Sequence, residues 1–160
     1  MKYVIKYPGL QNSLYHFKIQ VLQSIDYMNK VLPDSVQTPE DIYNWLKLRT
    51  TYVHDGDNEI FQTAQTLFEN NIHQLSGAGD CDCFSIAALA ALSSRGYKNI
   101  GIVLVGRSPK NAVHIYVYCK TEGETQILDL TNKNFNFERY YPFKQFIPFK
   151  VTPIKIIFKN

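Results

Sequence analysis

The sequence has no apolar run of the roughly 18 residues that a membrane-spanning helix needs, and no repeat or low-complexity tract. Its three cysteines, two of them one position apart, form no disulfide framework and suit a reducing compartment. The first residues lack the apolar core of a secretory signal. Charged residues make up only 19% of the chain and apolar residues 45%, which excludes a disordered or fibrous protein. We therefore expect a soluble, cytoplasmic protein with a single domain over residues 1–160.

The net charge of +3 is small but unevenly distributed along the chain. Residues 1–97 hold 7 Lys and Arg against 10 Asp and Glu, whereas residues 98–160 hold 10 against 4. A basic half can attract acidic partners, yet its lysines stand singly among apolar residues, as on solvated strand edges. We therefore expect neither a nucleic acid nor a membrane as partner, and we expect no cofactor.

Helical periodicity and helix-start signals dominate the first half of the chain. The run Thr38-Pro39-Glu40-Asp41 combines a capping hydroxyl, a proline for the first turn and two acids at the positive end of the helix dipole. The segment 84–92 is apolar on nearly every face, which is typical of a helix in the middle of a domain, and Gly96 is its stop signal. The predicted helices cover residues 13–31, 38 to about 52, 64–70 and 84–92.

From residue 99 onward the apolar period changes from helical to alternating. Runs rich in β-branched and aromatic residues are separated by Gly, Pro, Asn and Lys clusters. The predicted strands cover residues 99–105, 112–119, 125–130 and 151–158. Strands that follow several helices predict an α+β fold in which N-terminal helices and one buried helix pack on a mostly antiparallel sheet. Whether residues 2–7 join that sheet is left open.

Three residues form a possible nucleophilic constellation. Cys81 stands at the predicted start of the buried helix, where amide groups and the helix dipole favour a thiolate. Gly77 and Gly79 before it let the backbone approach closely. His114 begins one predicted strand and Asp129 ends the next, so neighbouring strands can bring the two together. A thiol needs a base for its proton, and the imidazole needs a carboxylate to fix its tautomer.

Each of these residues also has an ordinary structural interpretation. A cysteine at a helix start is commonly a small buried apolar residue, and a histidine in a strand commonly fills a core or surface position. An aspartate at a strand end is commonly a turn residue. Their joint order, with glycines before the cysteine, is what favours catalysis.

The segment Gly79-Asp80-Cys81-Asp82-Cys83-Phe84-Ser85, with the Ala- and Leu-rich helix after it, resembles the nucleophile motif of the transglutaminase-like superfamily. Residues 112–117 are similar to the histidine strand of that superfamily, and residues 127–131 to its aspartate strand. Residues 51–63 resemble the approach to the motif in short phage and bacterial members. The resemblance covers residues 40–132.

The resemblance implies a papain-like fold and acyl transfer through a Cys thioester at an amide bond of a peptide or protein. Cys81 would be the nucleophile, His114 the general base and then acid, and Asp129 the orienting carboxylate. The backbone amide of Cys81 would be one oxyanion donor. Gln62 is our candidate for a side-chain oxyanion donor, with Gln74 as the second choice.

Cys83 departs from the related sequences, which often carry Asp there. A thiol lacks the charge and acceptors of a carboxylate, so any support from that acid is missing. Cys83 would point about 200° away from Cys81 on a helix, which favours a buried apolar role. A zinc site formed by Cys81, Cys83, His114 and Cys119 is disfavoured, because these ligands would not converge.

Two functional hypotheses follow. The first is a cysteine peptidase or transglutaminase-type acyltransferase with no metal, acting on a peptide or protein. The second is a non-catalytic phage structural or binding module that retains the fold, which would have phage particle proteins as partners and lie in the host cytoplasm or the virion. The aromatic and basic segment 135–150 is expected to pack on the sheet and in part to flank the cleft.

Overall fold

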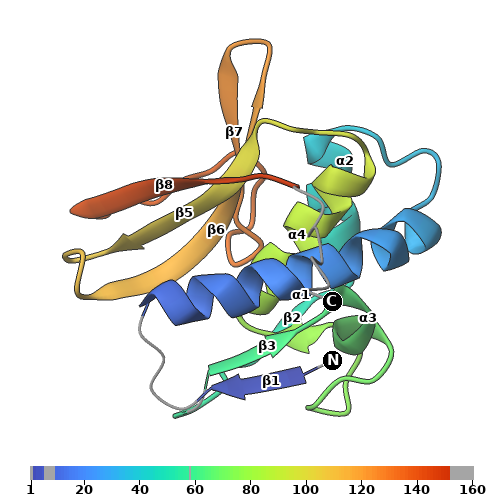
Figure 1. The fold of residues 1–160 in the computed structure, drawn as a ribbon. Helices are drawn as coiled ribbons and strands as arrows, with labels where there is room; N and C mark the ends of the chain where they lie inside the picture. Colours follow the sequence, from blue (N-terminus) through green and yellow to red (C-terminus); the bar gives the residue numbers. More distant parts are fainter. Residues whose placement is uncertain (1, 6–9, 58, 152–160) are drawn as a thin grey trace, which may run out of the picture.

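The computed structural model describes residues 2–5, 10–57 and 59–151, and the statements below refer to these residues. Helices lie on one side of a four-stranded antiparallel sheet, which gives the predicted α+β architecture (Figure 1). The helices are α1 (Leu10–Val31), α2 (Pro39–Lys47), α3 (Ala64–Phe68) and α4 (Cys81–Ser94). The strands are β1 (Lys2–Ile5), β2 (Thr51–Tyr52), β3 (Glu59–Gln62), β4 (Ala78–Gly79), β5 (Ile100–Gly106), β6 (Ala112–Thr121), β7 (Glu124–Leu128) and β8 (Phe143–Phe149).

Helix α4 occupies the centre of the molecule, as its apolar sequence predicts. All of its residues from Asp82 to Leu92 are buried, packed between α1 and strand β6. The helix ends at Ser94, and Gly96 follows it with a φ of +84°, which suits a residue without a side chain. The amide of Tyr97 donates back to the carbonyl of Leu92. At its other end, α4 begins with Cys81 as its first residue.

Helix α2 begins where the sequence predicts but ends earlier. The Thr38 hydroxyl accepts a hydrogen bond from the Asp41 amide at 3.1 Å, and the Asp41 carboxylate accepts one from the Thr38 amide at 2.9 Å. The helix stops at Lys47 instead of continuing to about residue 52, because Thr51 and Tyr52 form strand β2. This strand pairs in parallel with β4, so it places Tyr52 beside Gly79, just before the start of α4.

The main sheet has the strand order β7-β6-β5-β8 with antiparallel pairing throughout. Three of its strands match predictions, but the fourth is β8, in the segment predicted only to pack on the sheet. The strand predicted over residues 151–158 lies outside the described residues after Val151, which is itself not in a strand. Strand β1 does not join this sheet and pairs with β3 instead.

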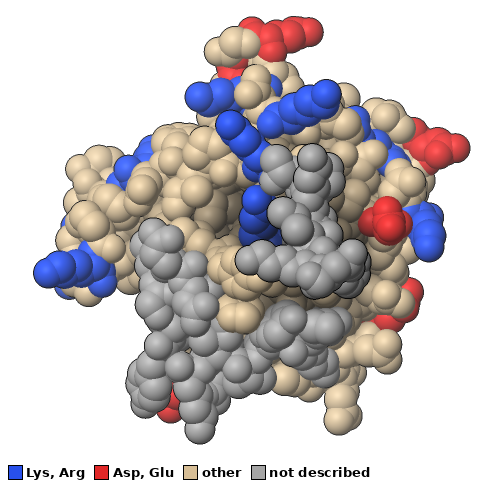
Figure 2. Space-filling model, viewed as in Figure 1, with Lys and Arg blue, Asp and Glu red and all other residues tan. Residues whose placement is uncertain are grey.

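No helix within the described ranges has the length and apolar character that a bilayer span requires. Figure 2 shows Lys and Arg side chains occurring singly or in small groups among uncharged atoms on the face in view. They do not merge there into the continuous basic surface that a nucleic-acid footprint needs. The basic character of the C-terminal half is therefore dispersed over this face.

Candidate active site

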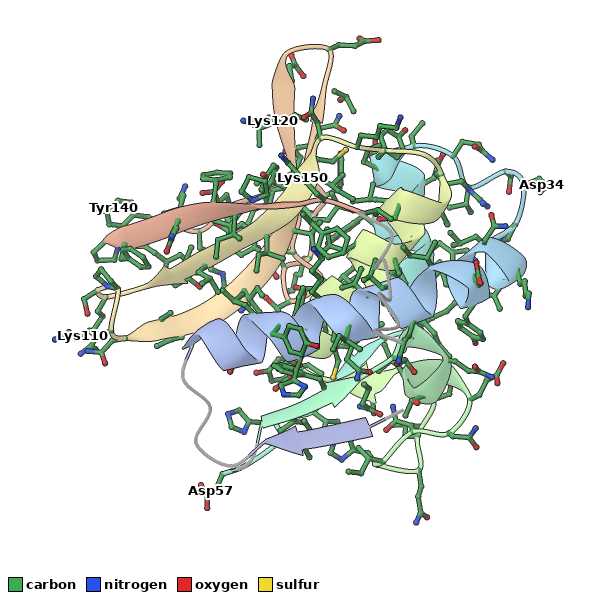
Figure 3. The ribbon with its side chains drawn as sticks, viewed as in Figure 1. Asp34, Asp57, Lys110, Lys120, Tyr140 and Lys150 are labelled. Carbon is green, nitrogen blue, oxygen red and sulfur yellow. The ribbon has the colours of Figure 1, made fainter. Side chains whose placement is uncertain are left out.

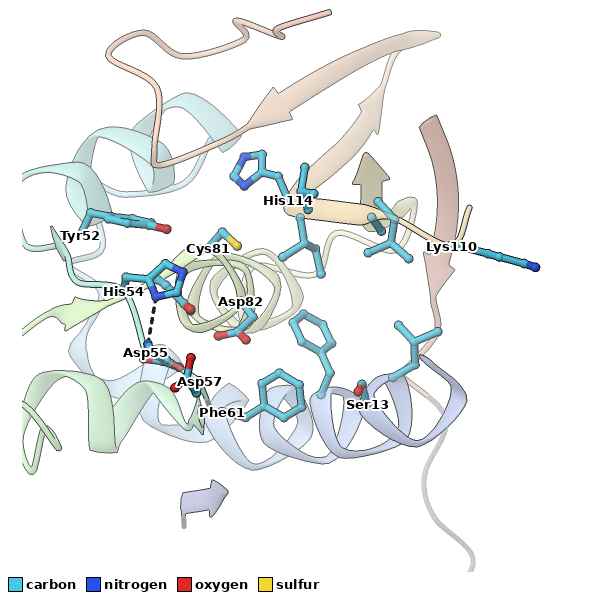
Figure 4. Close-up of a pocket in the computed structure, with 18 of the residues that line it drawn as sticks. Ser13, Tyr52, His54, Asp55, Asp57, Phe61, Cys81, Asp82, Lys110 and His114 are labelled. Atoms are coloured by element: carbon cyan, nitrogen blue, oxygen red, sulfur yellow. Dashed lines mark hydrogen bonds between the residues drawn. The ribbon is translucent and has the colours of Figure 1, made fainter. Parts of the chain in front are cut away.

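A cleft of about 560 Å³ opens at the N-terminus of α4. Most of its lining comes from the first part of α1, residues 52–57, residues 80–82 and the chain from Pro109 to Ile115, and Phe61 of β3 and Leu104 of β5 complete it. Cys81 and His114 both belong to this lining, and Figure 4 shows them on adjoining walls. The structure thus brings the predicted nucleophile and the predicted base to one cavity.

His114 and Asp129 are in direct contact. The Nε2 atom of His114 lies 2.8 Å from Oδ2 of Asp129. His114 is in β6, and Asp129 follows the last residue of β7, which pairs with Val117, so the two occupy diagonal positions on neighbouring strands. Because Nε2 is used by the carboxylate, the imidazole keeps Nδ1 for a partner in the cleft.

The Asp129 carboxylate is held by further donors that follow it in the sequence. Its Oδ1 accepts hydrogen bonds from the Thr131 amide at 3.0 Å and the Thr131 hydroxyl at 2.7 Å. Its Oδ2 also accepts one from the Asn132 side chain at 3.0 Å. Burial would raise the pKa of Asp129, but the hydrogen bonds from His114 and Thr131 and the charge of His114 together lower it. The group is therefore a carboxylate at neutral pH.

The surroundings of Cys81 differ from the sequence-based expectation of a favoured thiolate. Burial raises the pKa of the Cys81 thiol, and the charges of Asp80 and Asp82 raise it further. The hydrogen bond from the Ile115 amide opposes them and lowers it. Burial first, and the carboxylates on either side of Cys81 next, thus disfavour the thiolate, so the sulfur needs a base to take its proton.

A third carboxylate adds to this negative region. The Asp55 side chain is only 4% exposed, and its Oδ2 accepts a hydrogen bond from the Ile60 amide at 3.0 Å. Burial and the charge of Asp80 raise the pKa of Asp55 to about 6, although the amide of Ile60 and the nearby His73 act in the opposite direction. The Nε2 atom of His73 lies 3.6 Å from Oδ1 of Asp55.

The two glutamines proposed as oxyanion donors lie elsewhere. Gln62 is fully buried, and its amide donates to the Ala78 carbonyl at 3.3 Å and to the Cys83 sulfur at 3.7 Å. Its Oε1 atom accepts from the Ile72 amide, so the side chain holds the loop after α3 and does not line the cleft. Gln74 is exposed in a turn of that loop and does not line the cleft either. The structure therefore gives neither glutamine the position of an oxyanion donor.

Cys83 is fully buried, as its sequence context predicts, with its sulfur 3.3 Å from the Ile60 carbonyl.

The glycines before Cys81 allow close packing of the backbone. A side chain at Gly79 would meet the Cβ of Cys83 at 2.9 Å, and one at Gly77 would meet the Arg49 carbonyl at 1.8 Å. These glycines let the loop press against α4 and the end of α2.

Among the described residues, only Asp80, Asp82 and Cys83 form a group of three possible metal ligands within 4.8 Å of one another. Two carboxylates and a thiol are a poor match for zinc, which prefers thiolate and imidazole ligands, and supply few of the roughly six to eight oxygens that calcium takes. The zinc set that included His114 and Cys119 does not converge within the described chain.

Aromatic residues flank the imidazole on its far side. The ring centre of Tyr116 lies 5.6 Å from that of His114, and the ring centre of Tyr141 lies 6.3 Å from it. Tyr141 belongs to the aromatic segment 135–150, part of which therefore reaches the site as predicted. These rings limit the orientations open to His114.

By sequence, no family model and no curated protein matches this chain. By structure, it resembles a protein from Parabacteroides distasonis provisionally described as a protease, with a TM-score of 0.50 and 14% identity over 92% of this chain and 32% of that one. It also resembles calcium-bound LapG of Legionella pneumophila, with a TM-score of 0.48 and 19% identity over 81% and 69% of the two chains. A third structure, described as a TGase, gives a TM-score of 0.37 and 12% identity over 83% and 36%.

The chain thus spans about a third of the length of the Parabacteroides protein, and the likeness covers 92% of this chain. That likeness is one of fold, since the identity is low. Together with the buried helix α4 packed on an antiparallel sheet, it shows that the chain has a transglutaminase-like, papain-like fold.

Proposed function

We propose that the protein is a thiol-dependent acyl-transfer enzyme that cleaves or transfers at an amide bond of a peptide or protein. The observation that carries the proposal is the 2.8 Å contact between His114 and Asp129 at the edge of the cleft that Cys81 enters. The protease-like description of the Parabacteroides neighbour agrees with a peptide or protein substrate.

We assign the roles from the residues that share the cleft lining and from the contact between His114 and Asp129. His114 accepts the proton of the Cys81 thiol as the sulfur attacks the carbonyl carbon, and the ionised Asp129 stabilises the resulting imidazolium. A C–S bond forms, and the electron pair of the carbonyl moves to its oxygen. When the tetrahedral species collapses, the amine leaves with the proton from His114, which gives a thioester.

Water or an amine then attacks the thioester, with His114 accepting its proton, and the thiol is released. Hydrolysis and transamidation differ only in this second nucleophile. We propose hydrolysis of a peptide bond as the main reaction, because charged side chains, among them Asp55, Asp57 and Lys110, form part of the cleft lining and admit water.

Alkylation by iodoacetamide tests the thiol and its base. Cys83 and Cys119 are fully buried, so selective labelling of Cys81 would follow from exposure alone. The informative measurement is the rate at Cys81 in the wild type and in the variant His114→Ala, followed by mass spectrometry. We expect the variant to react at least tenfold more slowly at pH 7. His16→Ala is the matched control, since His16 lies outside the cleft lining.

A screen of peptide substrates with the wild type and Cys81→Ala then identifies turnover. Cleavage or thioester formation that disappears in Cys81→Ala supports the proposal. Equal alkylation of Cys81 with and without His114, combined with no Cys81-dependent turnover, would contradict it and favour the non-catalytic module.

A further inference from the structure

With neither glutamine in the cleft lining, the Tyr52 hydroxyl is a side-chain donor of the cleft that is directed toward the Cys81 sulfur (Figure 4). We propose, on the basis of the proposed function, that the Tyr52 hydroxyl is a catalytic group that donates a hydrogen bond to the oxyanion of the tetrahedral intermediate. The Cys81 amide would be the second donor of that oxyanion site.

Tyr52 is fixed next to the nucleophile by backbone pairing. It lies in β2 opposite Gly79 of β4, and the amide of the next residue, Val53, donates to the Gly79 carbonyl at 2.8 Å. Gly79 is separated from Cys81 by one residue, so two short strands set the distance between the tyrosine and the helix start. The Tyr52 ring also contacts Phe84, one turn into α4, with ring centres 6.3 Å apart.

The orientation of Tyr52 suits a donor to the cleft. Figure 4 shows its ring reaching from the wall opposite His114, with the hydroxyl directed toward the Cys81 sulfur. The ring is half-exposed, so a substrate carbonyl can approach the hydroxyl from the cleft. Burial raises the pKa of Tyr52, and the neighbouring Cys81 and Asp80 raise it further, which keeps the phenol protonated over the working range of pH.

The amide of Cys81 meets the requirement for a second donor. It is the first residue of α4, and the first amides of a helix have no intrahelical acceptor. A carbonyl carbon attacked by the sulfur would place its oxygen between this amide and the Tyr52 hydroxyl.

The hydroxyl donates without transferring its proton. As the C–S bond forms, the carbonyl electron pair moves to oxygen, and the hydrogen bond from Tyr52 stabilises the new negative charge. When the intermediate collapses, the pair re-forms the C=O bond, and the leaving group departs with the proton from His114. The phenol ends the step unchanged.

The test compares two reactions of the same sulfur. Alkylation by iodoacetamide forms a C–S bond without an oxyanion, whereas acylation by p-nitrophenyl acetate passes through one. We expect Tyr52→Phe to slow the burst of p-nitrophenolate by ten- to a hundredfold and to leave the alkylation rate of Cys81 within twofold of the wild type. Phenylalanine retains the ring and its contact with Phe84, so the fold is preserved. Tyr140→Phe, at the exposed end of the sheet labelled in Figure 3, is the matched control.

Each outcome decides the matter. Wild-type acylation by Tyr52→Phe would overturn the oxyanion role while leaving the proposed function intact. Equal slowing of acylation and alkylation would also overturn it, because Tyr52 would then act on the thiol itself. His54, a neighbour in the cleft, is the competing donor, and a burst that is lost in His54→Ala but kept in Tyr52→Phe would assign the role to His54 instead. A wild type without a Cys81-dependent burst would contradict the proposed function, and this inference with it.

Discussion

The two sides of the cleft treat their carboxylates in opposite ways. On the β6–β7 side, Asp129 accepts hydrogen bonds from His114, Thr131 and Asn132. Those from His114 and Thr131, with the charge of His114, lower its pKa despite burial. On the other side, Asp55, Asp80 and Asp82 lie near one another and near Cys81, where burial and mutual repulsion raise the pKa of Asp55 and of the thiol. One region is built to keep a charge, and the other makes a further charge costly.

The opposite pKa effects on the two sides of the cleft explain how the proposed nucleophile can stay a thiol until a substrate binds. A thiol among carboxylates does not ionise by itself, whereas an imidazole backed by a fixed carboxylate accepts its proton when a new bond stabilises the sulfur. The reactivity of Cys81 should therefore depend on His114 and Asp129 at every pH near neutrality.

The largest effect on the acylation rate is expected when Asp129, the carboxylate held by hydrogen bonds, loses its charge. Asp129→Asn should lower the acylation rate of Cys81 by about 10³-fold, because the amide neither stabilises an imidazolium nor fixes the same tautomer. The burst of p-nitrophenolate measures this. Asp34→Asn, which removes a charge far from the cleft, should leave the rate unchanged (Figure 3). A small effect at Asp129 would mean that His114 works without it.

Removing one hydrogen-bond donor to Asp129 should have a smaller effect, which we expect in the free energy of unfolding. Asn132 is buried, and Asn132→Ala should lower the free energy of unfolding at pH 7 by about 1–2 kcal/mol, measured by urea denaturation. A lowered carboxyl pKa stabilises the fold above the unfolded pKa of about 4, and this stabilisation is lost as the pH falls through the folded value. The difference between variant and wild type should therefore shrink in acid.

The matched control for that experiment is Thr131→Ser, which retains both the amide and the hydroxyl that Asp129 accepts from. It should unfold within about 0.5 kcal/mol of the wild type. A pH-independent loss in Asn132→Ala would show that the donor acts by packing and not through the charge of Asp129.

Neutralising Asp55, the buried carboxylate on the other side of the cleft, should raise the free energy of unfolding instead of lowering it. The pKa of Asp55 is raised by burial first and by Asp80 next, to about 6, so its ionisation destabilises the fold as the pH rises from about 4 to about 6. Asp55→Asn should unfold with a free energy about 1 kcal/mol higher at pH 7, with no gain at pH 4. Its amide oxygen can still accept from Ile60. Thermal unfolding between pH 4 and pH 8 measures this, and a loss of stability at pH 7 would contradict the assigned repulsion.

The smallest expected effect is on the thiol itself. Asp80→Asn removes a charge that raises the pKa of Cys81, after burial the largest cause of the shift, so the variant should react with iodoacetamide about two- to tenfold faster at pH 7. Asp80 is the N-cap of α4 but makes no side-chain capping hydrogen bond, so the helix start should survive the change. Asp26→Asn on the exposed face of α1 is the control, and an unchanged rate in Asp80→Asn would remove the repulsion argument.

Sequence periodicity predicted the elements that depend on local pattern or continuous burial. Helix α4 was predictable because its apolar residues surround the whole helix, and β5, β6 and β7 because their runs are rich in β-branched residues. The end of α2 was missed because no helix breaker precedes Thr51, and tertiary pairing with β4 decided it. Strand β8 was missed because its lysine, glutamine and proline hide an edge strand among aromatic residues.

The chemical order of the site was visible in the sequence, but its supporting contacts were not. Spacing predicted the meeting of His114 and Asp129, which is observed. Tyr52 gave no signal, because its place in the cleft depends on pairing between segments 27 residues apart. The sequence Asp129-Leu130-Thr131-Asn132 could have predicted the local donors, since a turn that follows an aspartate commonly returns an amide to its carboxylate.

Gly77 packs closely against the backbone of Arg49, just after α2, and this contact affects the candidate site although Gly77 takes no part in the proposed reaction. Any side chain there would collide with the Arg49 carbonyl, and the φ of +78° already disfavours one. A substitution at Gly77 would move β4 away from β2. The Cys81 sulfur and the Tyr52 hydroxyl would then shift relative to each other, although both residues remain unchanged. We therefore expect a substitution at Gly77 to disturb the candidate site, although Gly77 has no functional group of its own.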